Sequence, residues 1–133
     1  METEWDYSDR ASTYDKRADY SEKAIKELVT RTKTSPGKYV ADIGAGTGKL
    51  TKLLAGYSLK IYAVEPNDNM RIYGKKNTAE TDVVWSEGIG EETKLPDSRF
   101  HAAFFGSSFN VLNQQKTLME VARILTPNGW FAC

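Results

Sequence analysis

The sequence predicts an α/β fold in which strands alternate with helices around a mainly parallel sheet. Short apolar runs alternate along the chain with segments whose apolar residues recur at helical spacing. Glycines occupy alternate positions between one of these runs and the helix that follows it. With 133 residues, 40% of them hydrophobic and 27% charged, the chain is long enough for one domain with a buried core. This alternation favours parallel pairing through right-handed crossovers.

The first half of the chain supplies two helices and two strands. A short amphipathic helix is expected over Ser21 to Val29, with Ser21 as its N-cap. A strand over Tyr39 to Ile43 runs into the glycine-rich turn, and the leucine-rich helix after the turn ends at Gly56. A second strand is expected over Leu59 to Val64.

The second half repeats the alternation, with helix breakers between the elements. The expected elements are a helix from Asn67 to Gly74, strands Thr81–Trp85 and Phe100–Phe105, a helix with apolar positions between 118 and 125, a stop at Thr126–Gly129, and a fifth strand from Trp130.

Composition excludes several classes of function. Eighteen basic residues balance eighteen acidic ones, which argues against the positive field of a nucleic-acid-binding protein. No apolar run approaches the ~20 residues of a membrane span, and residues 1–10 lack the features of a secretory signal, so we expect a cytoplasmic protein. Cys133 is the single cysteine and His101 the single histidine, so no metal site and no internal disulfide is expected.

The glycine-rich turn and the end of the second strand carry the chemistry. A glycine turn between a strand and a helix lets backbone approach a ligand closely. Dinucleotide enzymes show G-x-G-x-x-G, whereas Gly44, Gly46 and Gly48 stand at alternate positions. Glu65 follows the second strand, where a carboxylate can accept both hydroxyl hydrogens of an unphosphorylated ribose.

Four motifs in this order resemble those of class I S-adenosylmethionine (SAM) dependent methyltransferases of the type 11 kind. They are Val40–Gly48, Ile61–Pro66, the loop Gly88–Phe100, and Arg123–Trp130, which is similar to an "L-x-P-G-G" turn. The resemblance spans Tyr14 to Cys133. The sequence departs from the family pattern at Ile89 and His101, where relatives carry Asp, and at Asn128, where glycine is common.

The resemblance implies a Rossmann-like three-layer αβα fold with strand order 3-2-1-4-5. The family normally continues through two further strands, one of them antiparallel, for which this sequence has no residues, so we expect a fold that lacks them. It also implies one domain over 1–133, with a helical lid at about 1–34 and a core at about 38–133. SAM is expected across the carboxyl ends of the first, second and fourth strands, with S-adenosylhomocysteine as the product.

The resemblance also implies a set of cofactor-binding residues. They are Tyr14, Tyr20, Asp42, Gly44, Ala45, Gly46, Gly48, Glu65, Pro66, Asn67, Met70, Gly90, Glu91, Gly106 and Ser107. For Asp42 a scaffold role in the turn and direct ligand contact are equally favoured, and Met70 also fits the core. His101 is expected to be structural, and no catalytic residue is assigned.

The predicted function is transfer of a methyl group from SAM to a small-molecule acceptor, whose identity the sequence does not give. The alternatives are a SAM-binding or interaction module without catalysis, and the N-terminal fragment of a methyltransferase; a nicotinamide oxidoreductase is disfavoured by the glycine spacing. We expect neither nucleic acid nor membrane as partner. The fifth strand leaves an edge that either pairs in a homodimer or receives a separate C-terminal segment.

Overall fold

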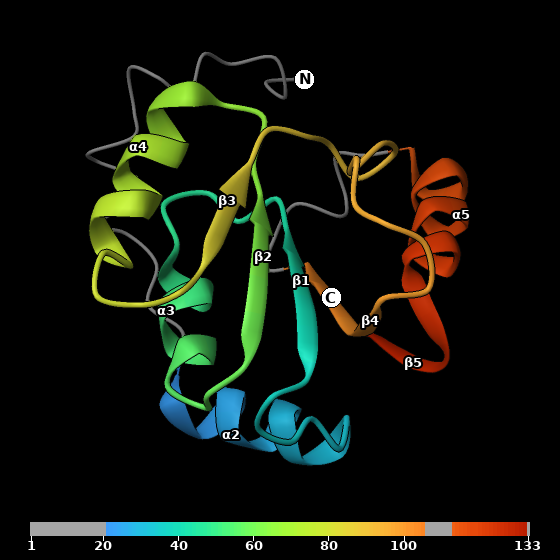
Figure 1. The fold of residues 1–133 in the computed structure, drawn as a ribbon, viewed down its shortest axis with the longest axis horizontal. Helices are drawn as coiled ribbons and strands as arrows, with labels where there is room; N and C mark the ends of the chain where they lie inside the picture. The colour runs from blue at the N-terminus through green and yellow to red at the C-terminus, as the bar shows by residue number, and fades with distance from the viewer. Residues whose placement is uncertain (1–20, 106–112, 133) are drawn as a thin grey trace.

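Five parallel strands form the central sheet of the computed structural model, which describes residues 21–105 and 113–132. The strands are β1 (Tyr39–Ile43), β2 (Lys60–Val64), β3 (Val84–Ser86), β4 (Phe100–Phe105) and β5 (Leu125–Ala132). Their order is β3-β2-β1-β4-β5, with every neighbouring pair parallel (Figure 1). The α/β fold and the strand order implied by the family resemblance are therefore confirmed.

Four helices flank the sheet, three of which connect strands, and polar caps fix where three of the four begin. The helices are α2 (Glu22–Arg31), α3 (Lys49–Ala55), α4 (Asp68–Asn77) and α5 (Gln114–Ile124). The side chains of Ser21, Asn67 and Asn113 each accept a hydrogen bond from the backbone N–H three residues later, which satisfies a donor that the helix leaves unpaired. The expected N-cap at Ser21 is confirmed.

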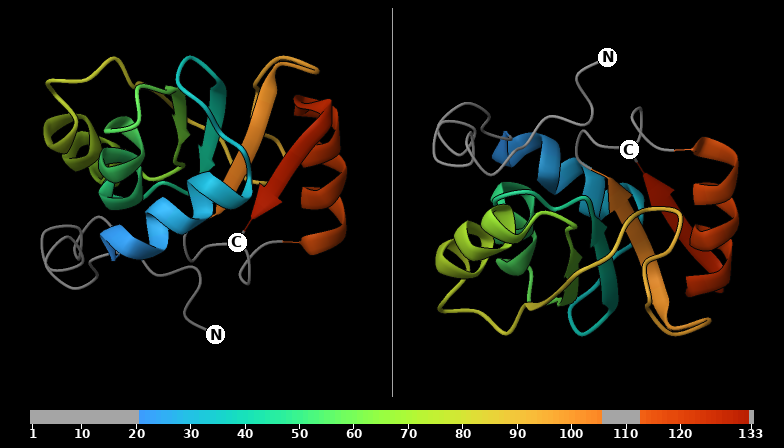
Figure 2. Two further views of the ribbon diagram at one scale, coloured as in Figure 1. Left: turned by 90° about the horizontal axis from the view of Figure 1, so that it is seen from below. Right: turned by 90° about the horizontal axis from the view of Figure 1, so that it is seen from above.

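Alternation along the strands sends side chains to two helical layers. Val40 of β1 packs with α2 and α3, whereas Ala41 and Ile43 pack with α5. The same alternation holds in β4, where Phe104 faces α2 and α3. Figure 2 shows α5 on one side of the sheet and α2, α3 and α4 on the other, so the molecule has three layers.

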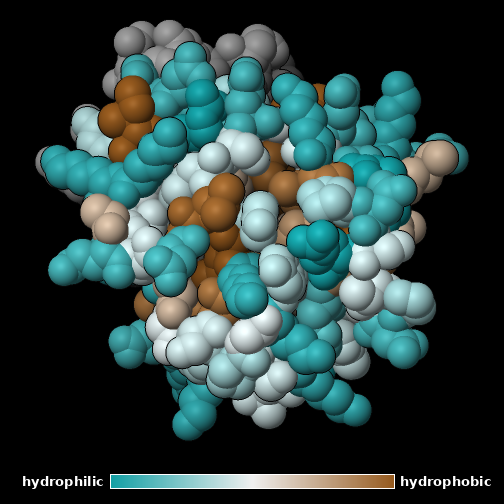
Figure 3. Space-filling view, viewed as in Figure 1, coloured by the Kyte–Doolittle hydropathy of each residue, from teal (hydrophilic) through white to brown (hydrophobic). Residues whose placement is uncertain are grey.

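The side of the sheet that carries α5 is less covered toward β3. Val84 of β3 pairs in register with Tyr62 of β2, and the Val84 side chain is 45% exposed. Figure 3 shows this face as mostly hydrophilic, with an apolar area near its centre over the strands. Among the described residues, none of the helices combines the length and the hydropathy that crossing a membrane requires.

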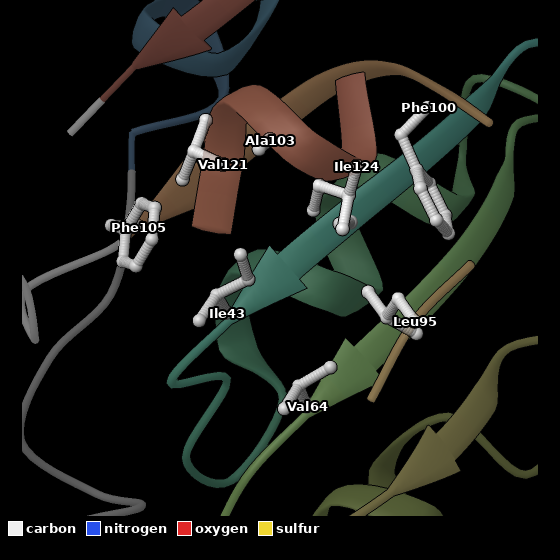
Figure 4. Close-up of a cluster of buried hydrophobic side chains, with 9 residues drawn as sticks. Ile43, Val64, Leu95, Phe100, Ala103, Phe105, Val121 and Ile124 are labelled. Carbon is white, nitrogen blue, oxygen red and sulfur yellow. The ribbon is translucent and has the colours of Figure 1, made fainter. Parts of the chain in front are cut away.

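The core beneath α5 fixes the carboxyl ends of the strands. Val121 and Ile124 of α5 pack with Ile43, Val64 and Phe105, and Figure 4 shows these side chains converging between the helix and the strands. Fully burying one such aliphatic or aromatic side chain stabilises the fold by roughly 1.5–3 kcal/mol. Because Ile43, Val64 and Phe105 are the last residues of their strands, this packing holds the edge where ligands bind in α/β sheets.

Besides the end of α2 at Arg31 and the start of β2 at Lys60, which lie two residues and one residue after the expected positions, three element boundaries differ from expectation. Gly74 does not end α4, which continues to Asn77, because Gly74 serves a close side-chain contact and not a helix cap. β3 starts at Val84 instead of Thr81, since Thr81 forms a local turn in which its hydroxyl donates to the Thr78 carbonyl. β5 starts at Leu125, directly after α5, and residues 126–129 form an irregularity in its pairing with β4.

Candidate cofactor-binding site

The glycine-rich turn joins β1 to α3 in a left-handed backbone. Gly44, Gly46 and Gly48 have φ values of +70°, +61° and +86°, which L side chains rarely adopt. The N–H groups of Gly44 and Ala45 both donate to the Val64 carbonyl, at 2.8 and 3.0 Å. The glycines therefore allow the turn to bend back onto the end of β2.

Glu65, the residue after β2, fastens that turn with its carboxylate. Oε1 accepts from the Gly46 N–H at 2.8 Å, and Oε2 accepts from the Asn67 N–H at 3.0 Å. The side chain is buried, and burial raises the pKa of Glu65, while the hydrogen bonds from Asn67 and Gly46 lower it. The hydrogen bonds from these two backbone N–H groups use half of the about four acceptor positions of a carboxylate. Glu65 therefore keeps acceptor capacity for a ligand.

Asp42 places a second carboxylate beside the turn. Its Oδ2 accepts a hydrogen bond from the Thr51 hydroxyl of α3 at 2.5 Å, while Oδ1 is buried without a partner among the described residues. Desolvation raises the pKa of Asp42 to about 7, although the Thr51 hydrogen bond opposes this rise and the charge of Glu65 adds to it. The scaffold role of Asp42 is therefore visible in its hydrogen bond with Thr51.

The start of α4 closes the site beyond Glu65. The Asn67 side chain caps the helix by accepting from the Met70 N–H at 2.9 Å, and Met70 is only 3% exposed. Arg71 donates from Nη1 to the Glu65 carbonyl at 2.7 Å, and its other nitrogen pairs with Asp68. Asn67 thus lies at the site with its oxygen used in the cap, whereas Met70 packs as a core residue.

The loop after β3 is held against α5. The N–H and hydroxyl of Thr93 both donate to Oε2 of Glu120, at 2.9 and 2.7 Å. Hydrogen bonds from Arg123, more than those from Thr93, lower the pKa of Glu120 to about 2. Oε2 of Glu91 accepts a hydrogen bond from the N–H of Asn113 at 2.9 Å, which ties the loop to the N-cap residue of α5. This loop, which belongs to the third of the four motifs, is therefore anchored at two points.

The structure brings one group of predicted residues together and leaves another undescribed. The turn from Gly44 to Gly48 adjoins Asp42, Glu65 and Asn67 at the carboxyl ends of β1 and β2. Pro66 is exposed beside Glu65, and Gly90 is buried in the loop after β3. Tyr14, Tyr20, Gly106 and Ser107 lie outside the described residues.

Several residues that matter to this site were not singled out in the sequence. Thr51 binds Asp42, and Glu120 anchors the loop after β3. Trp85 packs under the turn against Gly48. Trp85 belongs to no sequence motif. By contrast, Thr51 lies in the helix directly after the glycine turn, nine residues after Asp42, and this spacing could have indicated the contact.

Other features of the described residues do not join this site. His101 binds the Thr32 carbonyl through Nε2 at 2.9 Å, the structural role that was expected. The part of the chain that the structure describes has no group of three side chains suited to a metal ion. A cavity of about 580 Å³ lies at the opposite edge, lined by Tyr39, Lys60 and residues 80–84 near the amino ends of the strands.

Comparison with known proteins gives this geometry a context. The model of a family described as "Methyltransferase domain" matches residues 41–133. A demethylmenaquinone methyltransferase of Symbiobacterium thermophilum is 31% identical over 120 residues, which cover 84% of this chain and 48% of the relative. A ubiquinone/menaquinone biosynthesis C-methyltransferase of Caulobacter vibrioides is 28% identical over 120 residues, covering 80% of this chain and 47% of the relative.

Solved structures show the same fold. The crystal structure of a putative S-adenosyl-L-methionine-dependent methyltransferase from Methanococcus maripaludis aligns with a TM-score of 0.76 and 22% identity over 84% of this chain and 53% of its own. The chain spans about half the length of the curated relatives that it matches. The family model covers well over half of the sequence, and the chain belongs to this methyltransferase-domain family.

Proposed function

We propose that this chain binds SAM at the carboxyl ends of β1 and β2 and is the cofactor-binding part of a SAM-dependent methyltransferase. The observation that carries the proposal is the hydrogen bond from the Gly46 N–H to Glu65. It joins the glycine turn to the carboxylate of the neighbouring strand in one site. This site adjoins the point between β1 and β4 at which the strand order reverses.

The residues of the site fit the chemistry of this cofactor. Glu65 retains acceptor capacity for two ribose hydroxyls, and its charge makes those hydrogen bonds stronger. Oδ1 of Asp42, buried without a described partner, is an acceptor that a bound ligand would satisfy. Asp42 and Glu65 bring two carboxyl groups to the site, and a cation such as the sulfonium of this cofactor would favour their ionised forms.

SAM supplies an already activated methyl group, because the positively charged sulfur would leave the methyl carbon as a neutral thioether, which is a good leaving group. The protein then has to hold the cofactor and place an acceptor atom in line with the methyl carbon. The glycine turn allows the close approach, and Glu65 and Asp42 orient the bound molecule. Because the cofactor supplies the chemistry and the protein supplies the positioning, no catalytic motif is required, and none stands out in the sequence.

The acceptor in this proposal is a small molecule. Two relatives carry names that place them in the methylation of quinone precursors, which are small molecules. The balanced charge of this chain supports the same choice. Gly106 and Ser107 after β4, which are predicted to bind the cofactor, fall outside the described residues, and no residue that selects the acceptor is assigned.

We also propose one domain with an N-terminal segment that covers the site. Of this segment, residues 22–31 form α2, whose Ile25 and Val29 pack on the sheet together with α3. Tyr14 and Tyr20 lie outside the described residues, so cofactor contact by either tyrosine stays a prediction. Replacing each by phenylalanine and by alanine, and comparing SAM affinity, tests it.

Self-association through β5 is a further part of this proposal. β5 is an edge strand of the described sheet, and Trp130 on it is 39% exposed. An exposed edge offers unpaired backbone groups to a second strand. Sedimentation velocity between about 1 and 100 µM should show association in this range; a strictly monomeric protein would remove β5 as a contact.

Calorimetric titration of SAM, S-adenosylhomocysteine and NAD into the protein tests the proposed function. We expect saturable binding of SAM and S-adenosylhomocysteine and no binding of NAD. Binding of NAD alone would contradict the proposal and favour an oxidoreductase. Transfer of a labelled methyl group from SAM to pooled small-molecule acceptors separates an enzyme from a binding module.

A further inference from the structure

Trp85 of β3 packs against two glycines from different elements. A Cβ placed on Gly74 of α4 would lie only 2.1 Å from Cη2 of the indole, a distance that real side chains do not show. A Cβ placed on Gly48 would lie 3.1 Å from Cζ2 of the indole and 3.3 Å from the Cα of Gly74. Trp85, Gly74 and Gly48 therefore meet at one point, directly beneath the last residue of the glycine turn.

Hydrogen bonds hold the same three elements together. The indole Nε1 of Trp85 donates to the Thr78 hydroxyl at 2.9 Å, and that hydroxyl donates to the Gly74 carbonyl at 2.8 Å. Nδ2 of Asn77 donates to the Thr47 carbonyl inside the turn at 2.8 Å. The last part of α4 is thus bonded both to the indole and to the glycine turn.

Two contacts from different sides therefore hold the glycine turn in place. Glu65 holds the Gly46 N–H from the side of β2, and the Trp85 ring fills the space below Gly48. Gly48 has a φ of +86°, and the indole leaves only unusually tight space for a side chain there; no side-chain cap holds Gly48, so its position depends on packing. A cavity below Gly48 would let the turn adopt other positions, because packed interiors relax only partly around lost volume.

We propose that Trp85 is a positioning residue for cofactor binding, which sets the position of the glycine turn through Gly48. This inference rests on the proposed function, because it takes SAM as the ligand of the turn. Trp85 acts through the backbone of the turn and does not need to touch the cofactor. Loss of the ring leaves the carboxylates of the site in place but adds the cost of ordering the turn to each binding event.

A compensating pair of substitutions separates this role from a general effect on stability. Gly74→Ala alone introduces a methyl group that the indole excludes, so this variant should have a lowered melting temperature. Trp85→Leu removes the ring atoms that the methyl group would meet. In Trp85→Leu/Gly74→Ala the new methyl group fills part of the lost volume, and alanine favours the helix over glycine. The melting temperature of the pair should therefore exceed that of either single variant.

The test measures the Kd for SAM and the melting temperature of the wild type, both single variants and the pair. We expect about tenfold weaker SAM binding in Trp85→Leu, and the same weakening in the pair despite its recovered melting temperature. Trp130→Leu on β5 is the matched control, with unchanged SAM affinity. Wild-type affinity in the pair would overturn the inference, since it would make Trp85 a stability residue only.

Amide hydrogen exchange of the free protein tests this inference independently of the proposed function. If the wild type fails to bind SAM, the proposed function fails, and exchange of the Gly46 and Gly48 amides still tests the packing by Trp85. Those amides should exchange faster in the pair than in the wild type, and equal rates would overturn the inference. Trp85→Phe, which keeps a smaller ring and loses the bond to Thr78, should show the same effects to a lesser degree.

Discussion

The two ends of β1 and β2 differ in what they bury. At the carboxyl ends, two carboxylates lie side by side in the interior, and backbone amides and the Thr51 hydroxyl bind them. Asp42 is 1% exposed and Glu65 is 7% exposed. Burying an ionisable group destabilises a fold unless its hydrogen bonds offset the lost hydration.

The amino ends of the same strands hold no buried carboxylate among the described residues. Tyr39, Tyr62 and Phe100 form edge-to-face and tilted ring contacts there, with centroids 5.4–6.3 Å apart. The cations of Lys60 and Arg99 lie 5.1 and 5.2 Å from the centroid of the Tyr39 ring. These contacts are ordinary stabilising ones.

The comparison separates binding from stability within one sheet. Stability alone favours the arrangement at the amino ends, where apolar rings are covered and charges stay at the surface. The carboxyl ends retain buried carboxyl groups at a cost in stability, which is typical of functional sites. Substitutions at the carboxyl ends should therefore change SAM binding, and substitutions at the amino ends should change stability alone.

The largest effect is expected for Gly46→Val. The branched side chain opposes a φ of +61°, and it enters the space between the turn and the cofactor. We expect loss of SAM binding and destabilisation of about 1–3 kcal/mol in urea unfolding. Gly37→Val is the control at the amino ends: Gly37 has a φ of +86° and open space around it, so this variant should lose stability and bind SAM normally. Equal SAM binding by both variants would break the comparison.

Glu65→Ala should weaken SAM binding more than 100-fold by calorimetry. Two ribose hydroxyls would lose a charged acceptor, at about 1.5–3 kcal/mol for each hydrogen bond, and the Gly46 N–H would lose its partner. Glu80→Ala, an exposed carboxylate that lines the cavity near the amino ends, should leave the affinity unchanged. An unchanged affinity in Glu65→Ala would remove this residue from the site.

Asp42→Asn should change how stability depends on pH. The folded protein holds the Asp42 pKa near 7, above its ordinary value of 3.8, so Asp42 is protonated in the folded chain and ionised in the unfolded chain between these values. The contribution of the raised Asp42 pKa to the free energy of unfolding is complete below about pH 4. It is lost as the pH rises to about 7, and this loss amounts to at most about 4 kcal/mol. Urea unfolding at pH 5 and pH 8 should show a smaller decline in the variant. Parallel curves would contradict the raised pKa.

The smallest effect is expected for Lys60→Ala at the amino ends. The ammonium group of this exposed lysine contributes about 0.5–1 kcal/mol through the Tyr39 ring. Urea unfolding should detect this loss, and SAM affinity should stay as in the wild type. A change in SAM affinity from Lys60→Ala would mean that the two ends are coupled, or that the cavity near Lys60 is the binding site.

The fold could be predicted wherever the local pattern decides the structure. β1 and β4 have the predicted bounds, because both are apolar runs between clear breakers. Gly74 was misread as the end of α4, because only the tertiary contact with Trp85 shows why a glycine stands inside the helix. β3 and the start of β5 shifted because hydrogen bonds around Thr81 and an irregular pairing with β4 fix them, and neither is a sequence pattern.

The candidate site shows the same division. The glycine turn and Glu65 were found because their residue types and spacing carry the chemistry. Their direct bond could not be predicted, since it depends on how the turn folds back onto β2. Trp85, Glu120 and Asn77 support the glycine turn and the loop after β3 from other helices and strands. No sequence motif includes these three residues, so their contacts could not be predicted.

Resonance mapping of S-adenosylhomocysteine binding tests the central claim most directly, because both ends of the same strands are observed in one protein. In a titration of the labelled protein, we expect the largest amide shifts at Gly44, Gly46, Gly48 and Glu65. The amides of Gly37 and Lys60 should stay near their positions in the free protein. Shifts concentrated at Gly37, Lys60 and the cavity near the amino ends would contradict the assignment of the carboxyl ends as the cofactor site.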